Sequence, residues 1–199
     1  MMMKHVYVTL KVHRVARVRF PKTAREKRSL ARLVQRRQPR VRDVIGFTDG
    51  VSIPVQCASD MNRQAMDYNG YHHDTMCNNV FCFAPTGKII YSAINYPGSF
   101  HDSQVSVGLV NMVLEHLGPY KICVDQGFPR SGDMFDKFVG PMSQRTRDNL
   151  APAMRQMLLQ RYNIYVSLRQ SSEWGMRALQ GTFSRLKYRL PSDKESRRI

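Results

Sequence analysis

A short apolar run that ends in an acid is the feature that most constrains how this chain can fold. Residues 121–129 are Lys-Ile-Cys-Val-Asp-Gln-Gly-Phe-Pro, so three apolar residues lead directly into Asp125, and a glycine and a proline stop the run. A short apolar run bounded by turn residues predicts a buried strand. Open α/β sheets build their sites at the carboxyl ends of strands, which makes Asp125 a candidate functional acid. The alternative is that Asp125 only forms the turn.

Two further acids have comparable settings. A second apolar run, Val-Ile-Gly-Phe-Thr, ends in Asp49 and a glycine. Glu173 is the only acid within residues 149–192, a segment that is otherwise rich in arginine. On a helix it could simply pair with Arg169 or Arg177, each four residues away. However, oxygen ligands from separate, rigid elements are also what a site for hard divalent cations requires.

The order of apolar segments predicts an α/β fold. A strand, a hairpin of two strands, a helix, another strand and further helices follow one another, which is typical of a mixed sheet flanked by helices. The polar residues 57–75 predict a loop. The expected elements are a helix over 23–38, strands over 44–49, 76–84, 88–96 and 121–124, and helices over 103–117, 148–162 and 166–187.

Charge divides the chain into a basic arm and a nearly balanced body. Residues 1–42 hold 14 of the 31 Lys and Arg residues and one acid, whereas residues 43–199 hold 17 with 14 acids. Such an arm suits a polyanion, whose phosphates supply affinity through counterion release; a solvated charge run without a partner is the alternative. We expect an N-terminal arm over 1–42, a globular body over 43–190 and a polar basic tail over 191–199.

Composition also bears on the compartment. The four cysteines lie in apolar or strand-like contexts, which predicts small core residues in a reducing compartment. A zinc site of His72 and His73 with Cys77 and Cys82 is an alternative, but their spacings match no standard zinc finger. No run approaches the ~18 apolar residues of a membrane helix, so no membrane partner is expected. Residues 1–20 predict a strand or an extended arm and share the Arg-rich, acid-poor character of mitochondrial presequences. The basic clusters at 22–28 and 36–42 equally resemble nuclear import signals.

Four motifs in one order give the chain a resemblance to a known family. They are Phe-Thr-Asp-Gly at 47–50, Tyr-Pro-Gly-Ser-Phe-His-Asp-Ser at 96–103, Val-Asp-Gln-Gly-Phe-Pro at 124–129, and Glu-Trp-Gly-Met-Arg at 173–177 with Gly-Thr-Phe-Ser-Arg-Leu-Lys at 181–187. With 47 residues between Asp125 and Glu173, the chain from about 42 to 190 resembles the DDE-type endonuclease domain of PIF/Harbinger transposases and of the nucleases derived from them. That family has an RNase H-like fold.

The resemblance implies metal-dependent cleavage of DNA in the nucleus, with or without strand transfer. Asp49, Asp125 and Glu173 would form an Asp-Asp-Glu triad that holds two Mg²⁺ or Mn²⁺ ions. Ions about 3.5–4 Å apart would clamp the scissile phosphate, one activating the attacking water or 3′-hydroxyl and the other stabilising the leaving oxygen. Asp49 is expected to bridge both ions, with one of the other acids on each.

Each of several other residues in the motifs has two possible interpretations. Asp102 is a fourth metal-binding acid of the family pattern, or the N-cap of the helix that follows it. His101 orients an acid or contacts a phosphate, or it merely packs at the turn. Arg177 and Lys187 contact the DNA backbone or are solvated. Trp174 is expected in the core beside the site rather than as a base-stacking platform.

A second function stays open beside the first. Members of the family usually carry a helix-turn-helix DNA-reading region ahead of the nuclease domain, and residues 1–42 are too few for one. Arg36 and Arg37 of the arm are candidates for DNA contacts, and a separate DNA-binding accessory protein is a further expected partner. The family fold also continues past the Glu-bearing helix. The alternative is therefore a truncated or domesticated relic without catalysis that binds DNA or a partner.

Overall fold

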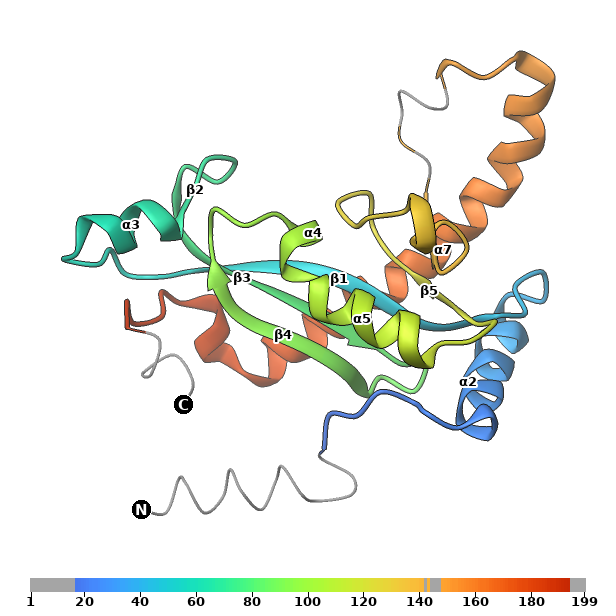
Figure 1. Ribbon diagram of the computed structural model, residues 1–199, viewed down its shortest axis with the longest axis horizontal. Helices are drawn as coiled ribbons and strands as arrows, with labels where there is room; N and C mark the ends of the chain where they lie inside the picture. Colours follow the sequence, from blue (N-terminus) through green and yellow to red (C-terminus); the bar gives the residue numbers. More distant parts are fainter. Residues whose placement is uncertain (1–16, 142, 144–147, 194–199) are drawn as a thin grey trace.

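A six-stranded mixed sheet forms the centre of the computed structural model, which describes residues 17–141, 143 and 148–193 (Figure 1). The central strand β1 pairs with β3 in antiparallel orientation and with β5 in parallel orientation. On the outer sides, β2 and β4 pair antiparallel with β3, and β6 pairs parallel with β5. The strands are β1 (Val44–Pro54), β2 (Tyr68–Asn69), β3 (Asp74–Phe83), β4 (Ile89–Pro97), β5 (Lys121–Cys123) and β6 (Phe138–Val139).

The strand order identifies the fold class. Apart from the short β2, the order across the sheet is β4-β3-β1-β5-β6. An antiparallel meander of three strands is thus extended, beside its first strand, by two parallel strands. This mixed sheet, flanked by helices, is consistent with an RNase H-like fold, so the predicted fold class is confirmed.

Helices cover both faces of the sheet (Figure 1). The short α4 and α5 lie on one face. The long α7 begins away from the body and then crosses the other face in its second half. The helix α2 packs near the start of β1 and begins with a capping box, in which the Thr23 hydroxyl accepts a hydrogen bond from the Glu26 N–H and the Glu26 carboxylate accepts one from the Thr23 N–H. The helical segments are α2 (Ala24–Arg37), α3 (Met61–Asp67), α4 (Asp102–Val105), α5 (Val107–His116), η1 (Gly132–Met134), α7 (Pro152–Thr182) and η2 (Ser184–Lys187).

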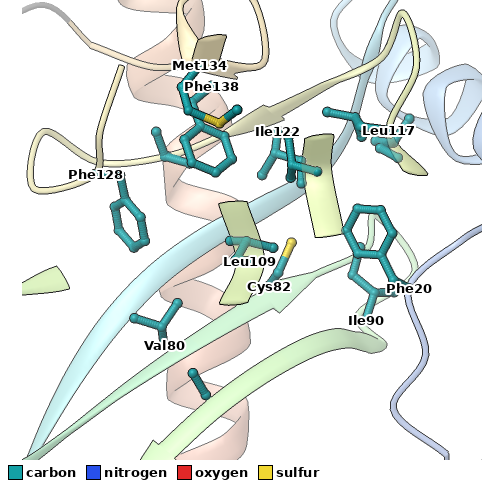
Figure 2. Packing of buried hydrophobic residues seen from close by; sticks show 14 of the residues in the cluster. Phe20, Val80, Cys82, Ile90, Leu109, Leu117, Ile122, Phe128, Met134 and Phe138 are labelled. Carbon is teal, nitrogen blue, oxygen red and sulfur yellow. The ribbon is translucent and has the colours of Figure 1, made fainter. Parts of the chain in front are cut away.

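Two buried clusters attach these helices to the sheet. The larger one joins α5 to β3 and β5; Figure 2 shows Leu109 with Val80, Cys82 and Ile122 among its members. The smaller one places Leu168 of α7 with side chains of α2, β1 and β5. Burying one such aliphatic side chain is worth about 1.5–3 kcal/mol. The strands β1 and β5 and the middle of α7 are therefore held firmly relative to one another.

The structure confirms the hairpin and the first helix. The strands β3 and β4 are joined through Gly87, whose positive φ of 81° suits a glycine. The helix expected over 23–38 is α2. Cys77, Cys82 and Cys123 are buried, as expected of small core residues, whereas Cys57 is exposed.

Several expected boundaries are wrong. The first strand does not end at Asp49, because the residues from Gly50 to Pro54 continue to pair with β3. The polar segment 57–75 is not only a loop: it contains β2 and α3, whose N-cap Asp60 accepts a hydrogen bond from the Arg63 N–H at 2.7 Å. The helix expected over 103–117 is divided at Ser106 into α4 and α5. The two helices expected over 148–162 and 166–187 are largely one, α7, since no glycine or proline interrupts residues 153–174.

Two sequence predictions fall on the ends of the chain, outside the described residues. The strand or extended arm expected over residues 1–20 falls mostly on 1–16, and the end of the basic tail on 194–199; both lie outside the described residues. Within the described part of the chain, no helix combines the length and the apolar character needed to cross a membrane.

Candidate active site

The first two acids lie on neighbouring parallel strands. The register of β1 and β5 pairs Phe47 with Cys123. Two residues further along each chain direction come Asp49, within β1, and Asp125, just after β5. Because parallel neighbours advance together, these two acids lie at corresponding positions. The predicted convergence of strand-borne acids therefore follows from the register, although Asp49 lies inside its strand and not at the end.

An arginine joins the third acid to the second. Arg169 and Glu173 lie four residues apart on α7, so they share one face of the helix. The Arg169 guanidinium donates from Nη1 to Asp125 Oδ1 at 2.8 Å and from Nη2 to Glu173 Oε1 at 2.9 Å. The predicted pairing of Glu173 with an arginine four residues away is thus confirmed for Arg169. The bond to Asp125 was not predicted.

A fourth acid, Asp102, lies against the backbone beside the first two. It is the first residue of α4, whose N-cap is His101, so the interpretation of Asp102 as the N-cap is wrong. A Cβ added to Gly50 would lie 2.8 Å from Asp102 Cγ, and one added to Gly127 would lie 3.1 Å from Asp102 Oδ2. The glycines that follow Asp49 and Asp125 in the sequence motifs therefore make room for this carboxylate.

The electrostatics of the site show unbalanced negative charge. Burial and the neighbouring Asp125 carboxylate raise the pKa of Asp49 from 3.8 to about 6, although Arg169 acts in the opposite direction. Burial, and again Asp125, raise the pKa of Asp102, which His101 partly offsets. Acids that repel one another and are partly withdrawn from water are typical of sites that receive a cation.

A substitution at Gly50 tests whether Asp102 occupies the space that the glycine leaves. Gly50→Ala should lower the free energy of unfolding by about 1–3 kcal/mol, because the new methyl group overlaps the Asp102 carboxylate. Asp102→Ala removes that overlap, so the double variant should recover part of the loss in a double-mutant cycle. Gly70→Ala is the control, since nothing lies within 4 Å of its added Cβ. Strict additivity of the two substitutions would contradict this placement of Asp102.

The remaining predicted residues lie outside this group. Lys187 is exposed in η2, and Arg177 is exposed on α7, one turn beyond Glu173. Trp174 is 53% exposed, so its expected place in the core is wrong; the Arg37 guanidinium lies 5.2 Å from its ring centroid. Arg36 is one of five arginines exposed along α2. The others are Arg25, Arg28, Arg32 and Arg37.

The carboxylates of the site are suitable metal ligands by their chemistry, although they are not arranged around a single ion position. Within the described residues, no group of three or more His, Cys, Asp or Glu side chains is placed to hold one ion. This includes the zinc candidates His72, His73, Cys77 and Cys82. Between Asp125 and Glu173 lies the guanidinium of Arg169 instead. Carboxylate oxygens from separate elements, around a half-buried acid with a raised pKa, are nevertheless the donors that Mg²⁺ and Mn²⁺ prefer.

Comparison with known proteins gives the family. The family described as DDE superfamily endonuclease matches residues 48–199, which include all four acids and Arg169. No curated protein matches the chain. Nucleases of this superfamily act on DNA and generally use divalent metal ions. With most of its length matched, and with a mixed sheet consistent with the RNase H-like fold, the chain belongs to the DDE superfamily endonucleases.

Proposed function

We propose that this protein is a DNA endonuclease of the PIF/Harbinger type, in which Asp49, Asp125 and Glu173 form the catalytic triad. The observation that carries the proposal is the shared guanidinium: Arg169 binds Asp125 and Glu173 at once, while Asp49 is close enough for both Asp125 and Arg169 to shift its pKa. Three acids, from β1, the segment after β5 and α7, are thus linked to one guanidinium, two by hydrogen bonds and Asp49 through its electrostatic influence.

The chemistry needs two divalent ions, Mg²⁺ or Mn²⁺, which the three triad acids would hold, with Asp102 as a further candidate ligand. When bound, such ions activate a water or 3′-hydroxyl and stabilise the leaving oxygen of the phosphodiester. The protein contributes rigid placement of its carboxylates. Asp49 is fixed in the central strand, Asp125 lies two residues beyond β5, and Glu173 is carried by the part of α7 that packs on the sheet.

The same family suggests roles for the other segments and residues of the chain. Residues 43–190 would form the nuclease unit, and the basic arm over 1–42, with Arg36 and Arg37, would add affinity for DNA. Arg177 and Lys187 would contact the DNA backbone, and His101 would orient Asp102, whose pKa it influences. A nuclear location and an accessory DNA-binding protein complete the proposal.

Nicking of supercoiled plasmid DNA tests the proposal. The purified chain should convert supercoiled to open-circular DNA with Mg²⁺ or Mn²⁺ and not with EDTA. Asp125→Ala should abolish this conversion, because it removes one metal ligand and the partner of Arg169. The readout is the fraction of open circles on an agarose gel against time. Nicking that persists in the variant would refute the triad.

One observation favours the second candidate function, a relic that binds DNA without cutting it. Four of the five exposed arginines of α2 recur at spacings of three and four residues, which places them along one side of the helix: Arg25, Arg28, Arg32 and Arg36. A basic surface of this kind can bind DNA without any contribution from the triad acids. A folded protein that shifts DNA equally well with EDTA, with Mg²⁺ and as Asp125→Ala, yet never nicks it, would establish this function instead.

A further inference from the structure

The Arg169 guanidinium occupies the position between two candidate metal ligands. One of its nitrogens donates to Asp125 and another to Glu173, so the two carboxylates, 48 positions apart in the sequence, are bridged by one planar group. Carboxylates and guanidinium are all only partly buried, with side-chain exposures of 35% and 37%. This arrangement satisfies both acids in the absence of any other cation.

An ordinary surface ion pair does not account for this arrangement. A solvent-exposed pair four residues apart on a helix contributes little and needs no second acid. Here the same guanidinium also reaches Asp125, which follows β5 on a different element from Glu173. One positive group is shared by two carboxylates, so the pair retains a net negative charge.

We propose that Arg169 is a resident counter-cation, which divalent ions must displace from Asp125 and Glu173, and which thereby sets the metal affinity of the site. This inference rests on the proposed function. An ion that is bound by both carboxylates needs oxygen positions that the guanidinium now uses, and two adjacent cations repel each other. The long, partly exposed side chain of Arg169 can turn toward solvent without disturbing α7, whose buried contact at this point is made by Leu168.

Binding of Mn²⁺ alone, measured by calorimetry on the full chain without DNA, tests the inference. Arg169→Met keeps a long, helix-forming side chain and removes the charge, so it should bind Mn²⁺ at least about tenfold more tightly than the wild type. Arg169→Lys keeps the charge but lacks the planar fork that spans two carboxylates, so its affinity should lie between the two. Arg177→Met is the control for charge, because Arg177 is likewise four residues from Glu173 but exposed; its affinity should change less than threefold.

The direction of the change separates this role from a merely structural one. If Arg169 only held Asp125 and Glu173 in place, Arg169→Met would bind Mn²⁺ more weakly or equally well, and either result would overturn the inference while leaving the metal site intact. An equal gain in Arg177→Met would also overturn it. If no variant and no wild-type protein bound Mn²⁺, the proposed function itself would fail. Binding in Arg169→Met alone would be the strongest support.

A second measurement uses the wild-type protein and does not depend on how the Met variant folds. The Nε–H resonance of Arg169, assigned by its absence in Arg169→Lys, reports the environment of the guanidinium. Titration with Mg²⁺ should move this signal toward the position of a free arginine, with the same midpoint as Mg²⁺ binding measured by calorimetry. A signal that stays unchanged at saturating Mg²⁺ would show that the ion leaves Arg169 in place, and would overturn the inference.

Discussion

Asp49→Asn should lower metal-dependent nicking at least about 100-fold and, in EDTA, should make the protein more stable above pH 6. The loss of activity follows from the removal of one triad carboxylate: a ligand contribution of about 3 kcal/mol to the transition state corresponds to about 100-fold in rate. The gain in stability follows from the raised pKa of Asp49, about 6 in the folded protein against 3.8 ordinarily.

The sign of the stability effect is fixed by proton linkage. Between pH 4 and 6 the folded protein holds a proton on Asp49 that the unfolded chain has lost, so the contribution of this group to stability is fully present below pH 4 and is lost as the pH rises through 6. Above pH 6 the wild-type protein carries the whole cost of an ionised, half-buried acid. Each pKa unit is worth about 1.4 kcal/mol, and access of water reduces the effect, so Asn should gain on the order of 2 kcal/mol.

Denaturant unfolding in EDTA at pH 4 and pH 7.5 measures this effect, and plasmid nicking measures the activity. The difference between Asp49→Asn and wild type should be present at pH 7.5 and absent at pH 4. Asp133→Asn, at an exposed position, is the control and should change neither quantity. If the difference in unfolding free energy between Asp49→Asn and the wild type were the same at pH 4 and at pH 7.5, the electrostatic description of the site would be contradicted.

Gly98→Ala should destabilise the protein by about 3 kcal/mol or more. A Cβ at this position would meet the carbonyl oxygen of Asp67 at the end of α3 and would lie 2.7 Å from the carbonyl oxygen of Met76 in β3. These are backbone atoms that cannot rotate away, unlike a side chain. The Gly98 carbonyl also accepts hydrogen bonds from the side chains of Asn69 and Asn78, which hold the turn in place. Overpacking of this kind costs 1–3 kcal/mol and occasionally more.

Thermal unfolding checks this prediction. For a domain of this size, 3 kcal/mol corresponds to a fall in Tm of roughly 6–12 °C. Gly181→Ala is the matched control: its added Cβ has nothing within 4 Å and lies in the last turn of α7, so Tm should stay the same or rise slightly. A Gly98→Ala protein with wild-type Tm would mean that α3 does not pack against this turn.

Sequence reasoning succeeded where the information is local. The apolar run before Asp125, the turn glycine Gly87 and the capping residue Thr23 each act within a few residues, and each predicted its element correctly. It failed where pairing partners decide the outcome. β1 continues past Asp49 because β3 offers partners as far as Met76. Residues 51–55 are strand-like in sequence, but Asp49 and Gly50 look like the end of a strand, so the continuity depends on the pairing with β3.

The site shows the same division. The spacing of Glu173 and Arg169 was visible on one helix, whereas the bond from Arg169 to Asp125 joins residues 44 positions apart and depends on how α7 crosses the sheet. In the sequence, Asp102 stands just before the expected helix, which favours a capping role. In the structure its carboxylate lies beside the other acids, in space that is open because Gly50 and Gly127 have no side chains. Glycines after both strand-borne acids were the signal that could have shown this.

The crossing of α7 over the sheet also sets the order in which the acids come together. The meander of β1, β3 and β4 arises from neighbouring segments and can form early, whereas the pairing of β1 with β5 and the docking of α7 close longer loops. A growing polypeptide on the ribosome carries Asp49 and Asp125 well before Glu173 is made. If the three acids act as the proposed triad, a chain whose last helix has not docked, or has detached by local unfolding, would lack a complete site and would leave nearby DNA uncut even when its strands are intact.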